Sequence, residues 1–481
     1  MNEENKRKTE SNAEVTDPSQ NKLVKNGVIQ CFIHSYEKYN ALSVLIAVVS
    51  VITIVIIAAD ECRQCFIKLK SEPQSNKETH LKKFWVYGKN IQTGYLKEVF
   101  TILERLGYEN NPNATEWDLL WAHEYPFRKL HSQLNNLKPH QKVNHFPGCG
   151  YITNKVDLAT SGLKYIPPAF KLPVDKEKFL EYSSKYSNIS FVQKNNDHRN
   201  IQIRKISDID LDKEGTFLQE YVDKPLLVSG HRFDIGIYTV ITSVDPLRVY
   251  IYNGDAILSM KESLNAFLRA QGRNPDVIWE QIEDAIGSVI LARESLIVDT
   301  LRRFKSKRNF FEMMRMDFII DENLNIYLLE ANMSPNLSSA HFPPNKLIYH
   351  QVLYNVLGLV GVAEYISKNS LKTRSKSEEE MIVSDKNIAT FSKMCNSNLC
   401  RTSCVSLECQ LCKPCLSSET RQYLVQAYKE HLHIGDCKRV FPPSMDQKEA
   451  FESINLDKFS PENQLQYRWF QGKCQLDQSW C

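Results

Sequence analysis

The spacing of apolar and polar residues changes along this chain, and it is most uniform near the N-terminus. Residues 41–59 read ALSVLIAVVSVITIVIIAA, nineteen residues without a charge. As a helix they would span roughly 28 Å, close to the hydrocarbon thickness of a bilayer. A buried core helix rarely lacks a polar face over this length, and a signal peptide has a shorter apolar region closer to the N-terminus. The pattern therefore predicts one transmembrane helix at 41–59, between a polar disordered tail at 1–40 and a charged juxtamembrane stem at 60–82.

From residue 83 onward the periodicity becomes that of a folded, mixed structure. FWVYG is typical of a short strand, and the helical spacing of the apolar residues after it predicts a small N-terminal α/β subdomain over 83–150. Between 151 and 367, strand-like runs such as LRVYIYN and NIYLLEA alternate with helical runs. This alternation favours an α+β or α/β domain. A Ser-, Lys- and Glu-rich stretch at 368–390 is typical of a linker, and 391–481 is a Cys-rich tail.

Composition narrows the class of protein. The chain has 481 residues, of which 42% are hydrophobic and 24% are charged, the balance of a globular protein large enough for two or three packed units. The formal net charge is +3, and Lys and Arg are spread along the whole chain. Recognition of nucleic acid needs a concentrated basic face, so we expect no nucleic-acid partner.

The thirteen cysteines are distributed unevenly along the chain. Six lie within 395–415, and none lies inside 150–394. Disulfides formed in an oxidising lumen explain this distribution. A zinc cluster in the cytosol also explains it, because Cys409, Cys412 and Cys415 keep two-residue gaps. Both interpretations remain open at this point.

The side of the membrane that the folded body faces is equally open. Asn113 and Asn188 are acceptors of the Asn-x-Ser/Thr type, which favours the lumen together with the cysteines. Basic residues are nearly equal in number on the two sides of the span and decide nothing. We expect a single-pass membrane protein with its body in the lumen or in the cytosol.

Acidic residues interrupt two apolar strands in the segment RMDFIIDENLNIYLLEANMSPNL. DENLN is typical of a turn, so Asp317 and Glu330 should lie on neighbouring strands of a hairpin. Asn332 is two residues beyond Glu330 and should project from the same face. Two carboxylates and an amide oxygen around one point suit Mg²⁺ that carries nucleotide phosphates. Ordinary surface acids would not explain charges inside such apolar strands.

Upstream segments place further polar residues at the ends of apolar strands. FVQK ends on Lys194, and QEYV, at 219–222, is followed by Arg232 and Asp234. Lys155 lies further back, in the segment NHFPGCGYITNKVDL. Each lysine alone would be interpreted as a surface residue, but their order before the acidic hairpin makes phosphate binding the better hypothesis.

That order of segments resembles the tubulin tyrosine ligase-like family. HFPGCGYITNKVDL, YIPPAFKLP, FVQK, QEYVDKPLLVSGHRFDIGIY, VDPLRVYIYN and DFIIDENLNIYLLEANMSPNL are similar to its successive signature segments, and the resemblance runs from about residue 85 to about residue 358. It implies an ATP-grasp ligase core over 151–367, with ATP and Mg²⁺ as cofactors. It also implies attachment of free glutamate to glutamate side chains through an acyl phosphate, with a tubulin tail or another acidic protein as acceptor.

The resemblance also implies roles for individual residues. The two acids and the amide of the hairpin would hold Mg²⁺. The lysines and an arginine would face phosphates, a short strand end would meet the adenine, and one further pair would line the junction of nucleotide and substrate. The proposed Mg²⁺ ligands are Asp317, Glu330 and Asn332, and the residues that face phosphates are Lys155, Lys194 and Arg199. Those that meet the adenine are Gln219, Tyr221 and Val222, and the pair at the junction is Arg232 with Asp234.

Three departures from the family pattern bear on activity. The stretch NNDHRNIQI, which follows Lys194, is short and lacks the glycines that let a backbone approach phosphate. The pattern FD-x-R-IY has Gly236 in place of its arginine, and an apolar run at 256–258 replaces a second arginine. An arginine fork suits phosphate and carboxylate groups, so both losses concern the anionic reactants. Three hypotheses follow: a glutamate ligase acting on tubulin, a ligase acting on a lumenal protein, and a membrane-anchored, non-catalytic binding module.

Overall fold

The computed structural model describes residues 82–112, 116–195, 202–340, 342–363 and 383–481. The chain divides into two units, Met1–Glu78 and Thr79–Cys481, and the fold described below is that of the second. The predicted tail, membrane span and all but the last residue of the stem lie outside the described residues.

A small parallel sheet opens the second unit. Its four strands run in the order β2-β1-β3-β4 and are covered by helix α3. α3 also packs on helix α10, and the buried carboxylate of Glu98 on α3 accepts hydrogen bonds from Ser339 Oγ, at 2.6 Å, and from His350 on α10. These elements are β1 (Lys83–Tyr87), α3 (Lys97–Arg105), β2 (Glu109–Asn110), β3 (Leu119–Ala122), α4 (His131–Leu134), β4 (Lys142–Val143) and α10 (Asn345–Leu359).

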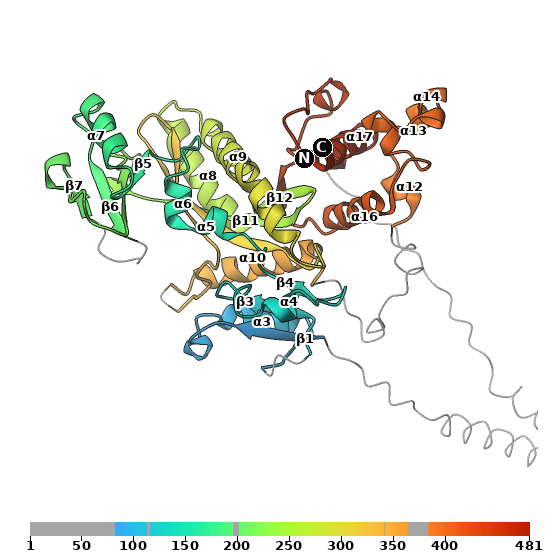
Figure 1. The fold of residues 1–481 in the computed structure, drawn as a ribbon, viewed down its shortest axis with the longest axis horizontal. Helices are drawn as coiled ribbons and strands as arrows, with labels where there is room; N and C mark the ends of the chain where they lie inside the picture. Colours follow the sequence, from blue (N-terminus) through green and yellow to red (C-terminus); the bar gives the residue numbers. More distant parts are fainter. Residues whose placement is uncertain (1–81, 113–115, 196–201, 341, 364–382) are drawn as a thin grey trace, which may run out of the picture. The chain divides into compact units, whose positions relative to one another are not determined.

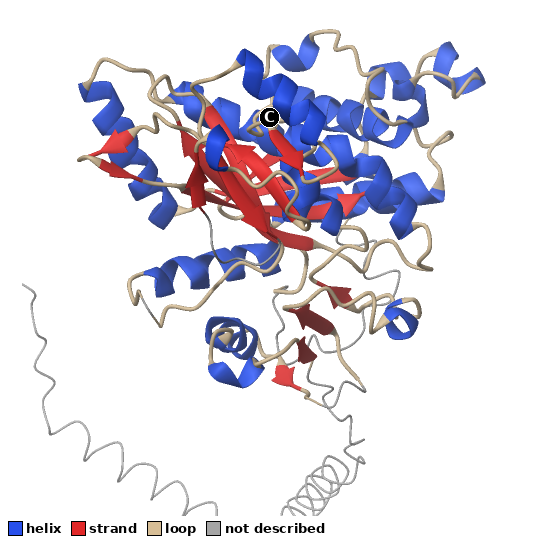
Figure 2. Cartoon of the chain, turned by 60° about the vertical axis from the view of Figure 1, so that its left-hand side comes forward, coloured by secondary structure: helices blue, strands red, loops and turns tan. Residues whose placement is uncertain are grey.

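The central sheet has five antiparallel strands in the order β14-β13-β11-β12-β15. Alternate residues of a strand point to opposite faces, and both faces are apolar. Ile237 and Ile241 of β11 pack with helix α9, whereas Tyr238 and Val240 pack with α10, so helices cover both faces (Figure 2). The elements are β11 (Ile235–Val244), β12 (Leu247–Tyr252), α8 (Asp255–Ala270), α9 (Asp276–Leu301), β13 (Glu312–Ile320), β14 (Ile326–Asn332) and β15 (Cys437–Phe441).

A third sheet, of order β5-β8-β6-β7, lies with helix α7 around a small core of its own (Figure 1). Leu172, Phe179, Phe191 and Leu218 form that core. Short elements connect this sheet to the rest of the unit. The bounds are α5 (Gly150–Thr153), α6 (Lys155–Ala159), β5 (Ala169–Lys171), α7 (Lys176–Lys185), β6 (Phe191–Asn195), β7 (Gln202–Arg204), β8 (Thr216–Glu220), β9 (Leu227–Val228) and β10 (His231–Arg232). The prediction of a mixed α and β fold is confirmed.

The Cys-rich region folds around a third core and is not a separate tail. Val383 and Ile388 are buried in that core, so packing begins inside the stretch interpreted as a linker. The six clustered cysteines form the disulfides Cys395–Cys412, Cys400–Cys409 and Cys404–Cys415, which decides between disulfides and zinc in favour of disulfides. A fourth joins Cys474 to Cys481. The helices are α12 (Asp385–Ile388), α13 (Ser392–Cys395), α14 (Asn398–Thr402), α15 (Leu407–Gln410), α16 (Ser418–Leu432) and α17 (Pro461–Leu476).

The same region supplies part of the central sheet. β15 pairs with β12 and forms one edge of that sheet. Beneath it, the fully buried Arg248 of β12 donates two hydrogen bonds to Glu430 of α16, at 2.7 and 2.9 Å, and a third to Gln466 of α17 at 2.8 Å. The C-terminal region is therefore part of the same folded body as the central sheet.

The predicted membrane localisation has to be corrected. Across the ranges that the structure describes, no helix combines the length and the apolar character needed to cross a bilayer. The segment 41–59, on which the prediction rested, lies outside those ranges. Nothing in the described residues supports the predicted span, so we retain neither the transmembrane helix nor the membrane as a partner.

Candidate active site

The acidic hairpin forms as predicted. Asp321 accepts hydrogen bonds from two backbone N–H groups of the turn and so fixes its shape. Asp317 on β13 stands directly opposite Glu330 on β14, and a bulge follows Asp317. The Asn332 amide donates to Asp317 Oδ2 at 2.9 Å and to Glu330 Oε1 at 3.0 Å. Three oxygen-bearing side chains therefore meet at one point of the sheet.

Cations of the protein itself neutralise both acids. Lys155, the first residue of α6, places its Nζ 2.6 Å from Glu330 Oε2. Arg315, two residues before Asp317 on the same strand, donates from Nε to Oδ1 at 2.7 Å and from Nη2 to Oδ2 at 2.9 Å. Lys155, which was predicted to bind phosphate, therefore contacts Glu330, which was predicted to bind the metal.

The two acids respond differently to their surroundings. Burial raises the pKa of Asp317 despite the hydrogen bonds from Arg315. Burial also opposes ionisation of Glu330, but the hydrogen bonds from Lys155 and Asn332 outweigh it and lower the pKa of that carboxyl. The two carboxyl groups therefore differ chiefly in how far hydrogen bonds offset their burial, and the negative charge of Glu330 adds to the rise at Asp317.

Lys194 lies at the end of β6 and is mostly buried. Its Nζ donates to Gln219 Oε1 at 2.8 Å. Burial lowers the pKa of Lys194 to about 8, and the charges of Lys155 and Arg232 act in the same direction, while Glu330 opposes them. Such interactions are strong only over short distances. Lys194 therefore contacts Gln219 directly and is coupled electrostatically to Glu330 of the acidic hairpin.

The pKa of Lys194 predicts a pH dependence of nucleotide binding. A phosphate beside Lys194 favours the ammonium form, so binding takes up a proton wherever the free protein has lost it, above about pH 8. Affinity for ATP should fall as pH rises from about 7 to about 9.5, at most about tenfold per unit. Lys194→Arg should flatten the profile, because arginine stays protonated. Calorimetric titration in buffers of different ionisation enthalpy measures both affinity and proton uptake. Equal affinity at the two ends of this pH range, without proton uptake, would contradict the assignment.

A second group of predicted residues lies around Tyr221, just after β8. Arg232 Nη1 donates to Tyr221 Oη at 3.0 Å, and its guanidinium lies 5.4 Å from the centre of the Tyr221 ring. Arg232 Nε is 4.0 Å from Asp234 Oδ1, and Val222 is half-buried beside Tyr221. The effect of Arg232 on Lys194 connects this group to the hairpin. Arg199, the remaining predicted residue, lies outside the described residues.

A buried network fixes the segment that leads to Lys155. His145 Nδ1 lies 2.8 Å from Glu312 Oε1 on β13, and its Nε2 lies 2.8 Å from the Ala122 carbonyl oxygen on β3. The other oxygen of Glu312 accepts from the Phe146 N–H at 3.1 Å. His145, Cys149 and Glu312 are spaced as metal ligands can be, but both ring nitrogens already have protein partners. We interpret the cluster as a structural tie between the small parallel sheet and β13.

The residues present fit Mg²⁺ and a nucleotide. Two carboxylates and an amide form a hard oxygen site, once Asn332 turns its amide oxygen inward. The buried Nε2 of Gln219 has no hydrogen-bond partner among the described residues. A buried donor without a partner is costly, and an acceptor atom of an adenine ring would satisfy it.

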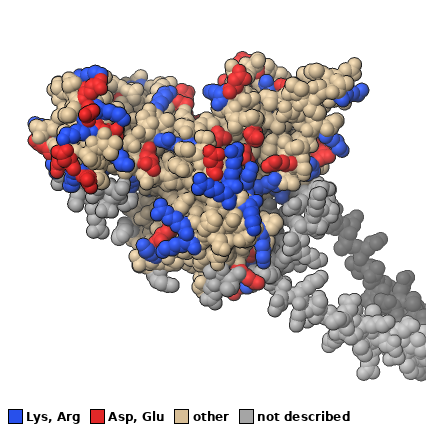
Figure 3. Space-filling model, in the orientation of Figure 1, with Lys and Arg blue, Asp and Glu red and all other residues tan. Residues whose placement is uncertain are grey.

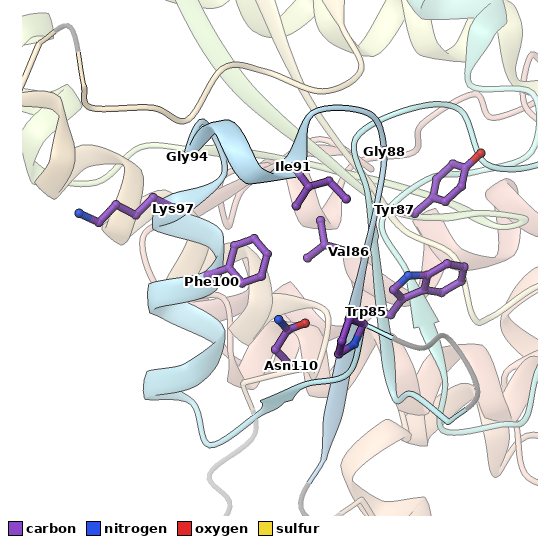
Figure 4. A pocket seen from close by; sticks show the side chains of 10 residues that line it. Trp85, Val86, Tyr87, Gly88, Ile91, Gly94, Lys97, Phe100 and Asn110 are labelled. Atoms are coloured by element: carbon purple, nitrogen blue, oxygen red, sulfur yellow. The ribbon is translucent and has the colours of Figure 1, made fainter.

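The N-terminal subdomain contains a cavity that is separate from the acidic hairpin. A cavity of about 590 Å³ lies between β1 and α3, with Val86, Ile91 and Phe100 in its wall (Figure 4). Lys97 is the charged residue of its lining, and no carboxylate is present there. It therefore cannot provide the acidic ligands that Mg²⁺ requires.

Arg315 is the site residue that sequence reasoning missed. It begins the segment chosen for its acids, and its spacing of two from Asp317 already placed both on one face of a strand. An arginine at that spacing from an acid inside an apolar strand was the available signal.

The sequence of this chain is similar to those of known proteins. The model of the tubulin-tyrosine ligase family matches residues 132–260 and 255–371. The probable tubulin polyglutamylase ttll-15 of Caenorhabditis elegans is 36% identical over 445 residues, which cover 82% of this chain and 85% of the relative. The chain belongs to the tubulin-tyrosine ligase family.

Two further relatives match a smaller share of the chain. The tubulin monoglutamylase TTLL4 of Mus musculus is 28% identical over 308 residues, which cover 51% of this chain and 25% of that protein. The tubulin polyglutamylase TTLL6 of Mus musculus is 24% identical over 365 residues, 63% of this chain and 44% of that protein. Membership identifies the chain as a ligase of this family, as the resemblance implied.

Proposed function

We propose that this tubulin-tyrosine ligase family member is an ATP-grasp ligase that attaches glutamate to glutamate side chains of tubulin tails. The observation that carries the proposal is the meeting of Asp317 and Glu330 with Lys155 and Lys194 in one site. The relatives are named as tubulin monoglutamylases and polyglutamylases, which supports glutamate as the amino acid and tubulin as the acceptor.

The chemistry requires this combination of charges. A carboxylate is a poor acyl donor, so the acceptor carboxylate first receives the terminal phosphoryl group of ATP, and ADP leaves. The amine of free glutamate then attacks the acyl carbon, loses a proton and displaces phosphate. When bound, Mg²⁺ neutralises phosphate oxygens. Asp317, Glu330 and Asn332 would hold it, while Lys155 and Lys194 add positive charge where the phosphoryl group is transferred.

Surface charge also favours an acidic acceptor. Lys and Arg side chains gather near the middle of the face shown in Figure 3. A cleft of about 910 Å³ between the core and α16 is lined by basic side chains. They are Lys142, Arg308, Lys386, Arg421 and Lys429, which outnumber the two acidic residues of the lining, Asp385 and Glu430. A glutamate-rich segment would be attracted to such a surface, with an effect on association that salt weakens.

Transfer of labelled glutamate tests the proposal. Wild type should label tubulin, or a glutamate-rich peptide, only with ATP and Mg²⁺, and Glu330→Gln should lower the rate by about 10²-fold or more. Glu322→Gln is the matched control, because Glu322 lies on the turn of the same hairpin and is exposed.

Each other outcome has a clear meaning. Equal silence of wild type and Glu330→Gln with every acceptor and amino acid would reject the ligase in favour of a binding module. Transfer of a different amino acid would reject glutamate, and labelling of the peptide without tubulin would reject the acceptor.

A further inference from the structure

Arg315 lies beside Asp317 in the acidic hairpin. Its guanidinium lies against Asp317 through two parallel hydrogen bonds. The Arg315 side chain keeps 35% of its surface exposed, so it is reachable from solvent although it arises from a strand of the sheet. A fork of this kind suits phosphate oxygens as well as a carboxylate.

Gly236 makes room for that side chain. Gly236 on β11 pairs with Asp317, and its neighbour Tyr238 pairs with Arg315. A Cβ at Gly236 would lie 3.0 Å from Arg315 Cδ, 3.1 Å from Arg315 Nε and 3.1 Å from Asp317 Oδ1. The φ angle of Gly236 is not positive, so its backbone conformation does not require glycine. What requires glycine is the space that Arg315 fills.

We propose that Arg315 supplies the anion-binding guanidinium of the transfer centre, from β13, where the family pattern has an arginine on β11 at the position of Gly236. This inference rests on the proposed function and assigns one of its residues. Positions 236 and 315 are diagonal neighbours across an antiparallel pair, close enough for a long side chain from either one to reach the same point. Arg315 on the adjacent strand would thus take the place of the family arginine.

The contact with Asp317 explains how this guanidinium serves the reaction. Arg315 holds both oxygens of Asp317, so Asp317 can act as a metal ligand only if the fork moves from at least one oxygen. The phosphoryl group of the acyl phosphate lies in the same site and offers two oxygens to the same fork. Arg315 thus binds the transferred phosphoryl group and stabilises the charge on its oxygens while the amine attacks.

The loss of an arginine at position 236 therefore does not by itself indicate a weak enzyme. From the family pattern alone, restoring the arginine with Gly236→Arg would be expected to raise activity. The structure reverses this expectation. The Cβ of an arginine at position 236 would lie against the side chain of Arg315, and the two guanidinium groups would compete for the same space.

Exchange of the two residues tests the proposal with four proteins: wild type, Arg315→Gly, Gly236→Arg and the double variant. Arg315→Gly should slow glutamate transfer by about 10²–10³-fold while Mg-ATP affinity changes by only a few fold. Gly236→Arg alone should also be slow. The double variant should recover at least about tenfold over Arg315→Gly. Exposed Arg302, paired with Asp299 on the surface, provides the control Arg302→Gln, which should match wild type.

Several results would overturn the assignment. A wild-type rate in Arg315→Gly removes Arg315 from the reaction, and a double variant no faster than either single variant removes the idea of an exchanged position. If Arg315→Gly does not fold, Arg315→Lys and Arg315→Gln replace it, and equal rates for the two would argue against a charge role. A silent wild type would overturn the proposed function together with this inference, whereas an active wild type with an unaffected Arg315→Gly overturns the inference alone.

Discussion

Glu330→Ala should abolish the magnesium dependence of nucleotide binding and leave a folded protein. Glu330 has one oxygen on Lys155 and the other on the Asn332 amide, so the substitution removes a metal ligand and at the same time releases a lysine. Loss of an indirect partner of a metal site costs about 10–100-fold in metal affinity, and loss of a ligand should cost at least as much. The released ammonium should bind phosphate even without metal.

The result has a distinctive form in calorimetry. Wild type should bind ATP at least about 100-fold more tightly with Mg²⁺ than without, and Glu330→Ala should bind it equally in both conditions. Asp317→Ala should behave in the same way, because it releases Arg315. Unchanged affinity for Mg-ATP in either variant would remove the hairpin from the metal site, and Glu322→Gln again serves as the control.

Glu430→Ala should unfold the protein or come close to it. Glu430 is buried and accepts from Arg248 through two hydrogen bonds, from Thr242 at 2.8 Å and from Tyr250 at 3.1 Å. Removing it leaves the fully buried guanidinium of Arg248 without its counter-charge. Breaking a buried pair in this way costs about 3–5 kcal/mol, a large part of the roughly 5–15 kcal/mol by which domains are stable.

Denaturant unfolding measures that loss, and two controls identify its cause. The double variant Arg248→Met with Glu430→Leu should lose much less stability than Glu430→Ala, because it leaves no unpaired charge. Glu283→Gln breaks the partly exposed pair with Lys438 and should cost no more than about 1 kcal/mol. If Glu430→Ala and Glu283→Gln cost the same, the buried pair does not hold the C-terminal region on the sheet.

The acidic hairpin was predictable from sequence because its interactions are local. Two apolar strands, a five-residue turn and a period of two place Asp317, Glu330 and Asn332 together without knowledge of the rest of the fold. Lys155 and Lys194 come from other elements, and only the order of motifs in the family connected them to the hairpin. No spacing in the sequence predicts that each would find a partner in the site.

What was missed depends on pairing between distant segments. The role of Arg315 follows from its position beside Gly236, about 80 residues earlier, which only the register of β11 on β13 defines. β15 was missed for the same reason, since its partner β12 lies almost 200 residues upstream. The start of the C-terminal core was placed too late, because Val383 and Ile388 are single apolar residues in a polar stretch and show no period. The membrane span was inferred from the length and lack of charge of 41–59, a segment outside the described residues.

The position of β15 at the end of the chain has a consequence for biosynthesis. Every described strand and helix that carries the proposed nucleotide site has been synthesised once β14 ends at Asn332, but the strand that covers β12 ends at Phe441. At about 5–20 residues per second, roughly 110 further residues take about 5–20 s to synthesise. During that interval β12 is an uncovered edge with unpaired backbone groups, and the nascent chain can pair there with other strands. We expect chaperone contact with the nascent chain to concentrate in this interval, when the residues of the proposed site have been synthesised and the sheet that positions them is incomplete.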